Sequence, residues 1–133
     1  KKHQKLLFKN PINVITTSKL NLTRSHEIIV NKFRADFLFK AQLYAHNFSN
    51  IDNPNCSCGH PQTVKHFFFH CAHLTHARDE FNQYLKNLIP EIFDRQISQH
   101  KYLEVLKYGS TEISIELNSK MMTRLASFIK ANI

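Results

Sequence analysis

The fold is decided by the stretch Cys56-Ser57-Cys58-Gly59-His60-Pro61-Gln62-Thr63-Val64-Lys65-His66-Phe67-Phe68-Phe69-His70-Cys71. It contains all three cysteines of the chain, and its spacing is C-x-C-x7-H-x4-C when His66 is counted as the fourth group. Three thiolates and one imidazole form the ligand set of a closed, tetrahedral, structural zinc site. The sequence therefore predicts one structural Zn²⁺ held by Cys56, Cys58, His66 and Cys71.

The same spacing predicts how the backbone presents these ligands. Gly59 relieves the tight turn at the C-x-C pair, and Thr63 caps a short helix that carries His66. Because an α-helix rotates by about 100° per residue, two positions five apart do not share a face. We therefore expect this helix to end near His70, so that Cys71 can swing toward the metal.

Three other histidines are rivals for the fourth ligand position. His70 lies one helical turn from His66, whereas His60 and His73 are nearer the cysteines but sterically awkward. A catalytic zinc is disfavoured, because the chain has no H-E-x-x-H motif and no C-x-x-C with an H-x-E deaminase pattern. We therefore expect no catalytic residue in this chain.

The rest of the chain fits a single small helical domain. Its 133 residues, 42% apolar and 21% charged, have the composition of a globular protein with a modest core. Two glycines are too few for the turns of a sheet-rich fold, which favours helices joined by short loops. The predicted fold is all-α: a basic arm over residues 1–24, followed by a zinc-stapled helical domain over residues 25–133 with the metal segment at 56–71.

Apolar residues at steps of three and four predict four helices outside the metal segment. They are expected at residues 25–47, 73–88, 99–108 and 116–132. Ser25 is the expected N-cap of the first helix, and Gly109 follows the end of the third. Phe67, Phe68 and Phe69 are expected to fill the core rather than to stack on bases, because consecutive helical positions cannot all face one way.

Positive charge is concentrated in the first part of the chain. Residues 1–50 hold nine Lys and Arg against two acids, whereas residues 51–133 hold nine against eight. A cationic arm beside a near-neutral body is typical of proteins that bind a polyanion such as RNA or DNA. The expected phosphate contacts are Lys1, Lys2, Lys5, Lys9, Lys19, Arg24, Lys32, Arg34 and Lys40.

The composition also restricts the cellular compartment and the kinds of partner expected for this chain. Its apolar runs are far shorter than the roughly 18–20 residues needed to span a bilayer, and it shows no signal peptide. An odd number of clustered cysteines argues against a disulfide framework, so we expect an intracellular, reducing compartment, nuclear or cytoplasmic, and no secretion. Two isolated glycines cannot form a phosphate-binding loop, and we expect neither a membrane nor a small-molecule substrate as partner. Because the chain opens on Lys1 rather than methionine, we expect it to be a piece of a longer polypeptide.

The metal segment resembles the C-terminal Cys-rich region of non-LTR (LINE-type) retrotransposon reverse transcriptases. That region reads C-x-C-G-x-x-x-T-x-x-H-h-h-h-x-C, in which h is apolar. Here Cys56, Cys58, Gly59, Thr63, His66 and Cys71 all match in place, and the three phenylalanines match the apolar run. The likeness extends over residues 28–133: Arg34 agrees with one position of an upstream basic motif, and residues 103–109 and 128–130 are similar to the closing segments of the family.

This resemblance implies a retroelement polyprotein tail that binds nucleic acid. The enzymes of the family work by target-primed reverse transcription, in which cut target DNA primes the copying of the element's RNA, and the tail helps to hold RNA or DNA. The implied partners are RNA or DNA and the upstream reverse transcriptase domains of the same polypeptide. The alternative is an architectural module that braces a neighbouring domain or a partner protein without touching nucleic acid.

Overall fold

A computed structural model describes residues 14–48 and 50–133, and every regular element among them is helical. In chain order they are η1 (Thr17–Lys19), α2 (Arg24–Arg34), α3 (Lys40–Ala45), η2 (His66–His70), η3 (Ala72–Leu74), α4 (Thr75–Leu88), α5 (Pro90–Phe93), α6 (Gln99–Tyr108) and α7 (Ile115–Asn132). Pairing of the β type is limited, over these residues, to an isolated antiparallel bridge between Asn55 and Pro61. The predicted helical fold with a Cys/His group that could hold a metal ion is confirmed.

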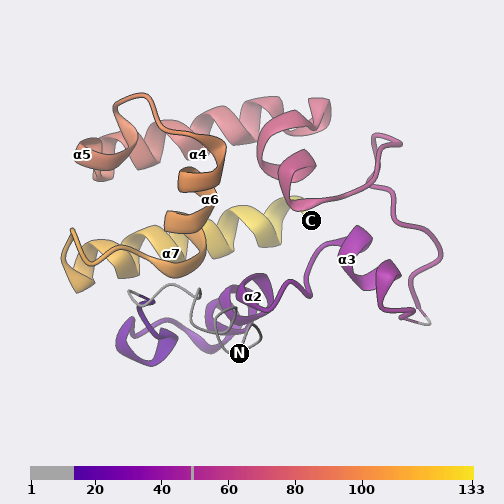
Figure 1. Ribbon diagram of the computed structural model, residues 1–133, viewed down its shortest axis with the longest axis horizontal. Coiled ribbons are helices and arrows are strands. Elements are labelled where there is room, and N and C mark those ends of the chain that lie inside the picture. Colours follow the sequence, from indigo (N-terminus) through magenta and orange to yellow (C-terminus); the bar gives the residue numbers. More distant parts are fainter. Residues whose placement is uncertain (1–13, 49) are drawn as a thin grey trace, which may run out of the picture.

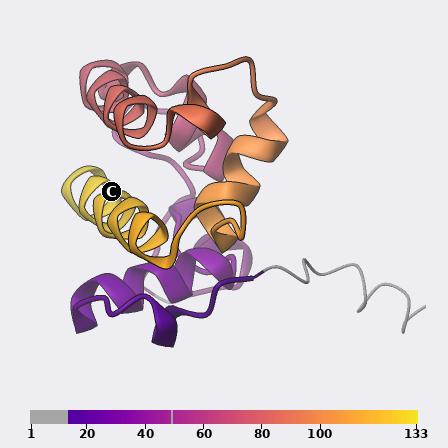
Figure 2. The ribbon, with the colours of Figure 1, turned by 90° about the vertical axis from the view of Figure 1, so that its left-hand side faces the viewer.

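The central helix of the fold is α7. Figures 1 and 2 show it between α4 on one side and α2 on the other, with α6 crossing beside it. Because neighbours cover it from two sides, its buried stripe is wide. The fully buried large side chains of this stripe are Met121, Met122, Leu125 and Ile129, and Phe128 is nearly as deep. These are core positions, as the periodicity predicts.

Aromatic rings fill the space between these helices. Phe81 of α4 stacks on Phe128 of α7 with ring centroids 4.5 Å apart and planes inclined by 2°. Phe67 and Phe68 are both buried, and their centroids lie 5.3 and 6.1 Å from that of Phe128. Phe69 is half-buried. The prediction that this apolar run fills the core is confirmed, so the turn that carries His66 is anchored in the core.

The single helix predicted for residues 25–47 is wrong, because the chain forms two helices there, α2 and α3. The break lies at Asp36, whose φ of 57° is in the left-handed region. The turn lets Phe39 insert fully into the core. The N–H groups of Leu38 and Phe39 then donate to Gln42 Oε1, at 2.9 and 3.0 Å, which satisfies them at the start of α3.

The expected N-cap of the first helix is also displaced. Thr23, not Ser25, caps α2, and its Oγ1 accepts a hydrogen bond from the N–H of His26 at 3.4 Å. The residues just before this cap pack against the body, because Ile15 is buried and its N–H donates to the carbonyl oxygen of Tyr108 at 2.9 Å. The segment from residue 14 onward thus belongs to the helical body, and it includes the short helix η1.

The helices after the metal segment agree closely with the prediction. Helix α6 has the predicted bounds, and Gly109 follows it with a φ of 80°. Helix α4 begins two residues later than expected because the 3-10 turn η3 precedes it, and α7 begins one residue earlier. None of the helices in the described segments combines the length and apolar composition that crossing a membrane requires.

Candidate metal centre

The loop that carries Cys56 and Cys58 is a tight hairpin. The N–H of Cys56 donates to the carbonyl oxygen of His60 at 2.8 Å, and the N–H of Gly59 donates to that of Cys56 at 3.0 Å. Gly59 has a φ of 96°, which glycine adopts without the steric cost of a Cβ. The turn brings the two sulfur atoms within 2.9 Å, which is too long for a disulfide bond of about 2.05 Å. The hairpin therefore presents two free thiol groups side by side.

The other half of the site is a single π-helical turn, η2. The Oγ1 of Thr63 accepts a hydrogen bond from the N–H of His66 at 3.0 Å, so the predicted cap is present. The N–H of Cys71 donates to the carbonyl oxygen of His66, five residues earlier, at 2.8 Å. This wider turn returns the fifth residue toward the side of the first. The helix ends at His70 as expected, and the widening that brings Cys71 back was not predicted.

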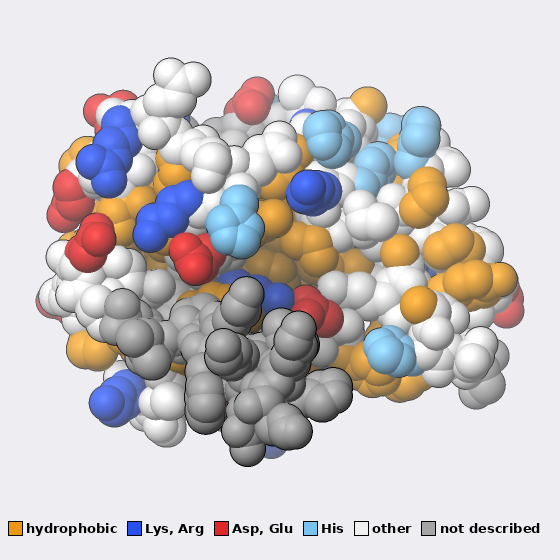
Figure 3. All heavy atoms as spheres, in the orientation of Figure 1, with side chains coloured by type: hydrophobic (Ala, Val, Ile, Leu, Met, Phe, Trp, Pro, Cys, Tyr) orange, Lys and Arg blue, Asp and Glu red, His pale blue; other side chains and the backbone are white. Residues whose placement is uncertain are grey.

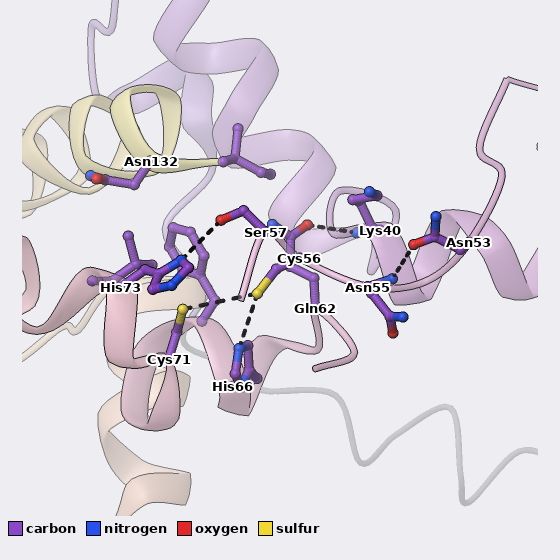
Figure 4. Close-up of a pocket in the computed structure, with 13 residues that line it drawn as sticks. Lys40, Asn53, Asn55, Cys56, Ser57, Gln62, His66, Cys71, His73 and Asn132 are labelled. Carbon is purple, nitrogen blue, oxygen red and sulfur yellow. Dashed lines mark hydrogen bonds between the residues drawn. The ribbon is translucent and has the colours of Figure 1, made fainter. Parts of the chain in front are cut away.

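Hairpin and turn together bring four ligand atoms to one place. The Nε2 of His66 lies 3.2 Å from Cys56 Sγ and 3.1 Å from Cys58 Sγ, and the sulfur atoms of Cys56 and Cys71 are 3.9 Å apart. All four atoms lie within 4.8 Å of one another, so the group could hold one metal ion. Figure 4 shows Cys56, His66 and Cys71 pointing toward one another from the hairpin and the turn.

The rival histidines lie outside this group of four. The Nδ1 of His73 is 3.2 Å from the hydroxyl of Ser57, and the side chain of His70 is exposed. The Nδ1 of His60 approaches Cys58 Sγ only to 3.6 Å. Among the four histidines weighed from the sequence, His66 is the one whose ring nitrogen faces two sulfur atoms at close range.

The two cysteines of the hairpin have thiol pKa values shifted in opposite directions. Two hydrogen bonds lower the pKa of Cys58 to about 5: the larger effect comes from the side chain of Cys56 and a smaller one from the backbone of His60. The pKa of Cys56 is raised to about 11, mainly by burial and to a smaller extent by its hydrogen bond with Cys58. One thiolate is thus ready at neutral pH, and a bound ion must displace the proton of the other.

Two polar side chains tie the centre to the helices around it. Arg78 of α4 donates from Nη1 to the carbonyl oxygen of Cys71 at 2.8 Å. Gln62 is buried, and its Oε1 accepts a hydrogen bond from the N–H of Lys40 at 2.8 Å while its carbonyl oxygen accepts from the N–H of Ala41 at 3.2 Å. The turn is thereby joined to α4 and the hairpin to α3. Sequence reasoning missed Gln62, because it belongs to no motif or periodic stripe.

The predicted phosphate contacts fall into distinct groups. Lys1, Lys2, Lys5 and Lys9 lie outside the described residues. Three others, Lys19, Arg24 and Lys32, are exposed, and Arg24 pairs with Glu27 at 3.0 Å.

The remaining two are partly enclosed. Arg34 turns inward, and its Nε donates to the carbonyl oxygen of Lys107 at 2.6 Å. Burial lowers the pKa of its guanidinium. Arg34 is therefore engaged within the body, and Lys40 is half-buried at the edge of a cavity beside the metal centre.

Comparison of the chain with protein-family models, with curated proteins and with solved structures gives no match.

Proposed function

We propose that this chain is a zinc-stabilised, non-catalytic module that binds RNA or DNA, of the kind found at the C-terminus of non-LTR retrotransposon reverse transcriptases. The observation that carries the proposal is the convergence of Cys56, Cys58, His66 and Cys71 on one point. The other two matching motif positions have physical roles as well. Gly59 supplies a positive φ in the hairpin. Thr63 caps the turn that carries His66, because its Oγ1 accepts a hydrogen bond from the N–H of His66.

Zinc is the ion that best fits these donors. Bonds of about 2.3 Å to sulfur and about 2.0 Å to nitrogen place tetrahedral zinc ligands roughly 3.5–3.8 Å apart. The separations between the ligand atoms run from 2.9 Å, between Cys56 Sγ and Cys58 Sγ, to no more than 4.8 Å, so they spread on both sides of that range. Thiolate ligands select zinc over magnesium or calcium. Three cysteines and one histidine complete a tetrahedral set, which supports a structural role and leaves no coordination position for a substrate.

Charge supports a nucleic-acid partner. All ten acids lie at or after residue 27, and four of the eighteen Lys and Arg precede residue 14. On the face shown in Figure 3, Lys and Arg side chains are dispersed among acidic ones. We therefore assign most phosphate contacts to the arm lysines, assisted by Lys19 and Lys32, which are exposed and form no ion pair with another described residue. Such contacts give affinity without sequence preference.

Salt dependence tests this function directly. Binding of the zinc-loaded chain to a labelled single-stranded RNA is measured by fluorescence anisotropy at increasing salt. The logarithm of the association constant is expected to fall by about 0.7–0.9 per neutralised phosphate for each tenfold rise in salt. An affinity that does not change with salt contradicts the proposal.

Charge reversal locates the contacts. Replacing Lys1, Lys2, Lys5 and Lys9 with glutamate is expected to abolish RNA retention. The matched control makes the same change in charge at four exposed lysines of the later helices, Lys86, Lys101, Lys120 and Lys130. It is expected to weaken binding far less, and an equal loss in both variants contradicts the role of the arm.

Within a longer polypeptide, the module would hold template RNA or target DNA beside the upstream reverse transcriptase domains. Three cysteines that form no disulfide bond fit a reducing, intracellular compartment. Deleting the module from such a polypeptide is expected to weaken template retention while polymerase activity on a pre-annealed primer persists. Loss of both activities together would favour the architectural alternative.

One observation favours that alternative. Tyr44 and Phe48 are 46% and 41% exposed, and Phe48 packs edge-on against Phe37 with centroids 4.7 Å apart. Exposed aromatic side chains that contact another ring, as Phe48 contacts the half-buried Phe37, can contribute to a protein contact surface. Replacing Tyr44 and Phe48 with serine distinguishes the two functions, because only a bracing role predicts loss of association with the neighbouring domain at unchanged RNA affinity.

A further inference from the structure

One side of α7 carries a row of cationic and hydroxyl side chains. Figure 2 shows α4 and α2 flanking this helix and α6 on a third side, while no described helix covers the fourth. A cavity of about 440 Å³ lies on this row, and it is lined by Tyr84 of α4 and by Ser119, Lys120, Thr123, Arg124 and Ser127 of α7. Two of these residues are cationic and none is acidic, so the lining favours an anionic ligand.

The guanidinium group of Arg124 is held in place by Tyr84. Its central carbon atom lies 4.7 Å from the centroid of the Tyr84 ring, which is a cation–π contact. Arg124 is exposed, and no carboxylate of the described residues forms an ion pair with it. Its planar fork of N–H donors is therefore restrained by the ring but not neutralised. This arrangement suits an anion that accepts two parallel hydrogen bonds.

The hydroxyl group of Ser127 is oriented by a histidine of α2. The Nδ1 of His26 is buried and has no hydrogen-bond partner among the described residues, so a proton there would be a buried donor without an acceptor. The proton of the neutral ring is better placed on Nε2, which lies 3.4 Å from Ser127 Oγ. Because Ser127 then accepts a hydrogen bond from His26, its own O–H is available to donate to a ligand in the cavity.

Lys120 contributes less to this cavity than Arg124 does. Its Nζ lies 3.7 Å from Oε2 of Glu116, one turn earlier on α7, so a carboxylate already offsets part of its charge. We therefore expect Lys120 to add general attraction rather than a fixed contact. This agrees with the small effect expected for the charge-reversal control that includes Lys120.

We propose that this cavity binds a backbone phosphate of RNA or DNA, with the guanidinium of Arg124 and the hydroxyl groups of Thr123 and Ser127 as donors. Arginine and the hydroxyl residues are among the side chains that contact phosphate oxygens in nucleic-acid complexes. The inference rests on the proposed nucleic-acid binding. It adds to the arm lysines a contact on the helical body, at a position that no sequence motif marks.

The shape of the donor set favours a phosphate over an acidic side chain. A phosphodiester group carries four oxygen atoms around a tetrahedral centre, so it can accept hydrogen bonds from several directions at once. A carboxylate carries two oxygen atoms in one plane, which the fork of Arg124 alone would satisfy. The hydroxyl groups of Thr123 and Ser127 lie on the same row as this fork and supply the further donors that only the phosphate uses.

The test compares Arg124→Gln with the wild type, both loaded with zinc, by fluorescence anisotropy of a labelled single-stranded RNA at increasing salt. Loss of one phosphate contact is expected to weaken binding about tenfold at low salt and to reduce the salt slope by about 0.7–0.9. Arg124→Lys keeps the charge but not the planar fork, so it is expected to keep the slope and to lose part of the affinity. The matched control is Arg95→Gln, at an exposed arginine that does not line this cavity, and it is expected to bind as the wild type does.

Nuclear magnetic resonance of the wild type decides the case even if a variant folds poorly. The Nε–H resonance of Arg124 is expected to shift on addition of the RNA and to stay in place with oligoglutamate. Equal losses in Arg124→Gln and Arg95→Gln, or an equal response of the resonance to oligoglutamate, overturns the cavity as a phosphate site and leaves salt-dependent binding by the arm intact. Failure of the wild type to bind RNA at low salt overturns the proposed function and this inference together.

Discussion

The backbone N–H of Cys71 donates to the carbonyl oxygen of His66 at 2.8 Å, so the last two metal ligands are also joined through the main chain. Phe67 and Phe68, which follow His66, are buried on the other side of the same turn. An ion bound by these ligands would therefore hold one face of the turn, and the aromatic core holds the other. Loss of either should loosen the other.

Replacing His66 with alanine is expected to abolish stoichiometric zinc binding and to unfold the domain. Structural zinc contributes about 10–16 kcal/mol in small zinc-dependent peptides, which is comparable to or larger than the usual 5–15 kcal/mol stability of a whole domain. Elemental analysis and circular dichroism measure the two effects. His70→Ala, at an exposed neighbouring histidine, is the control and is expected to keep one zinc per chain. A His66→Ala protein with full zinc content and unchanged melting would refute the assignment.

Phe68→Ala is expected to destabilise the zinc-loaded protein by about 3–5 kcal/mol, because it leaves a cavity among buried rings. The matched change, Phe69→Ala, removes a ring that is only half-buried against Tyr102, and its cost is expected to be about half as large. Urea unfolding at saturating zinc measures both values. Equal losses of unfolding free energy in the two variants would show that the turn η2, rather than burial of the rings in the core, determines the stability.

Gly109→Ala is expected to cost about 2 kcal/mol or more. A Cβ at this position would lie 2.7 Å from Asn118 Oδ1 and 2.9 Å from Ile15 Cγ1, and the φ of 80° is itself unfavourable for alanine. Asn118 is buried, and its Oδ1 already accepts a hydrogen bond from the N–H of Ser110 at 2.9 Å. Gly59→Ala meets open space at a φ of 96°, so it isolates the backbone strain of about 1–2 kcal/mol. Thermal melting of the two variants separates clash from strain, and equal costs would argue against the clash.

Tyr102 is expected to make the fold sensitive to alkali. Its ring is buried, its hydroxyl donates to Asn82 Oδ1, and burial raises the pKa of the phenol in the folded state. Since the folded pKa exceeds the unfolded value of about 10, this contribution to stability is complete below pH 10 and is lost as the pH rises beyond it.

At about pH 11 the loss amounts to about 1.4 kcal/mol of unfolding free energy. Tyr102→Phe is expected to be less stable than the wild type at neutral pH but to lose about that much less between pH 8 and pH 11. Urea unfolding at the two pH values provides the measurement. Tyr44→Phe, at an exposed ring, serves as the control and should follow the wild type. Parallel losses in wild type and Tyr102→Phe would remove Tyr102 as the cause.

The helices after the metal segment could be predicted because local signals mark their ends. Pro90 follows α4 and Gly109 follows α6, and the apolar stripes between such signals are regular. The break between α2 and α3 carries no glycine or proline. It depends on Phe39 reaching Phe33, Phe67 and Phe68, which is a tertiary contact that periodicity cannot reveal.

The candidate metal centre could likewise be predicted only in part. Residue type and spacing identify four ligands, because thiolate and imidazole chemistry restricts the choice. Spacing alone shows that His66 and Cys71 do not share an α-helical face, but it does not show that a π turn resolves the mismatch. The cavity next to the centre joins Gln62 and Lys40 to Asn132 at the far end of α7, so only the folded chain brings these groups together.

The central position of α7 has a consequence for synthesis. The metal-bearing turn needs Phe128 as a packing partner, yet Phe128 leaves the ribosome long after His66 and Cys71. Until then the thiols sit on a loop without a core beneath it, open to oxidation and proteolysis. Stable ion uptake at this site would therefore be a late event in the life of the nascent chain, and products truncated before α7 should be degraded rather than accumulate as competing fragments.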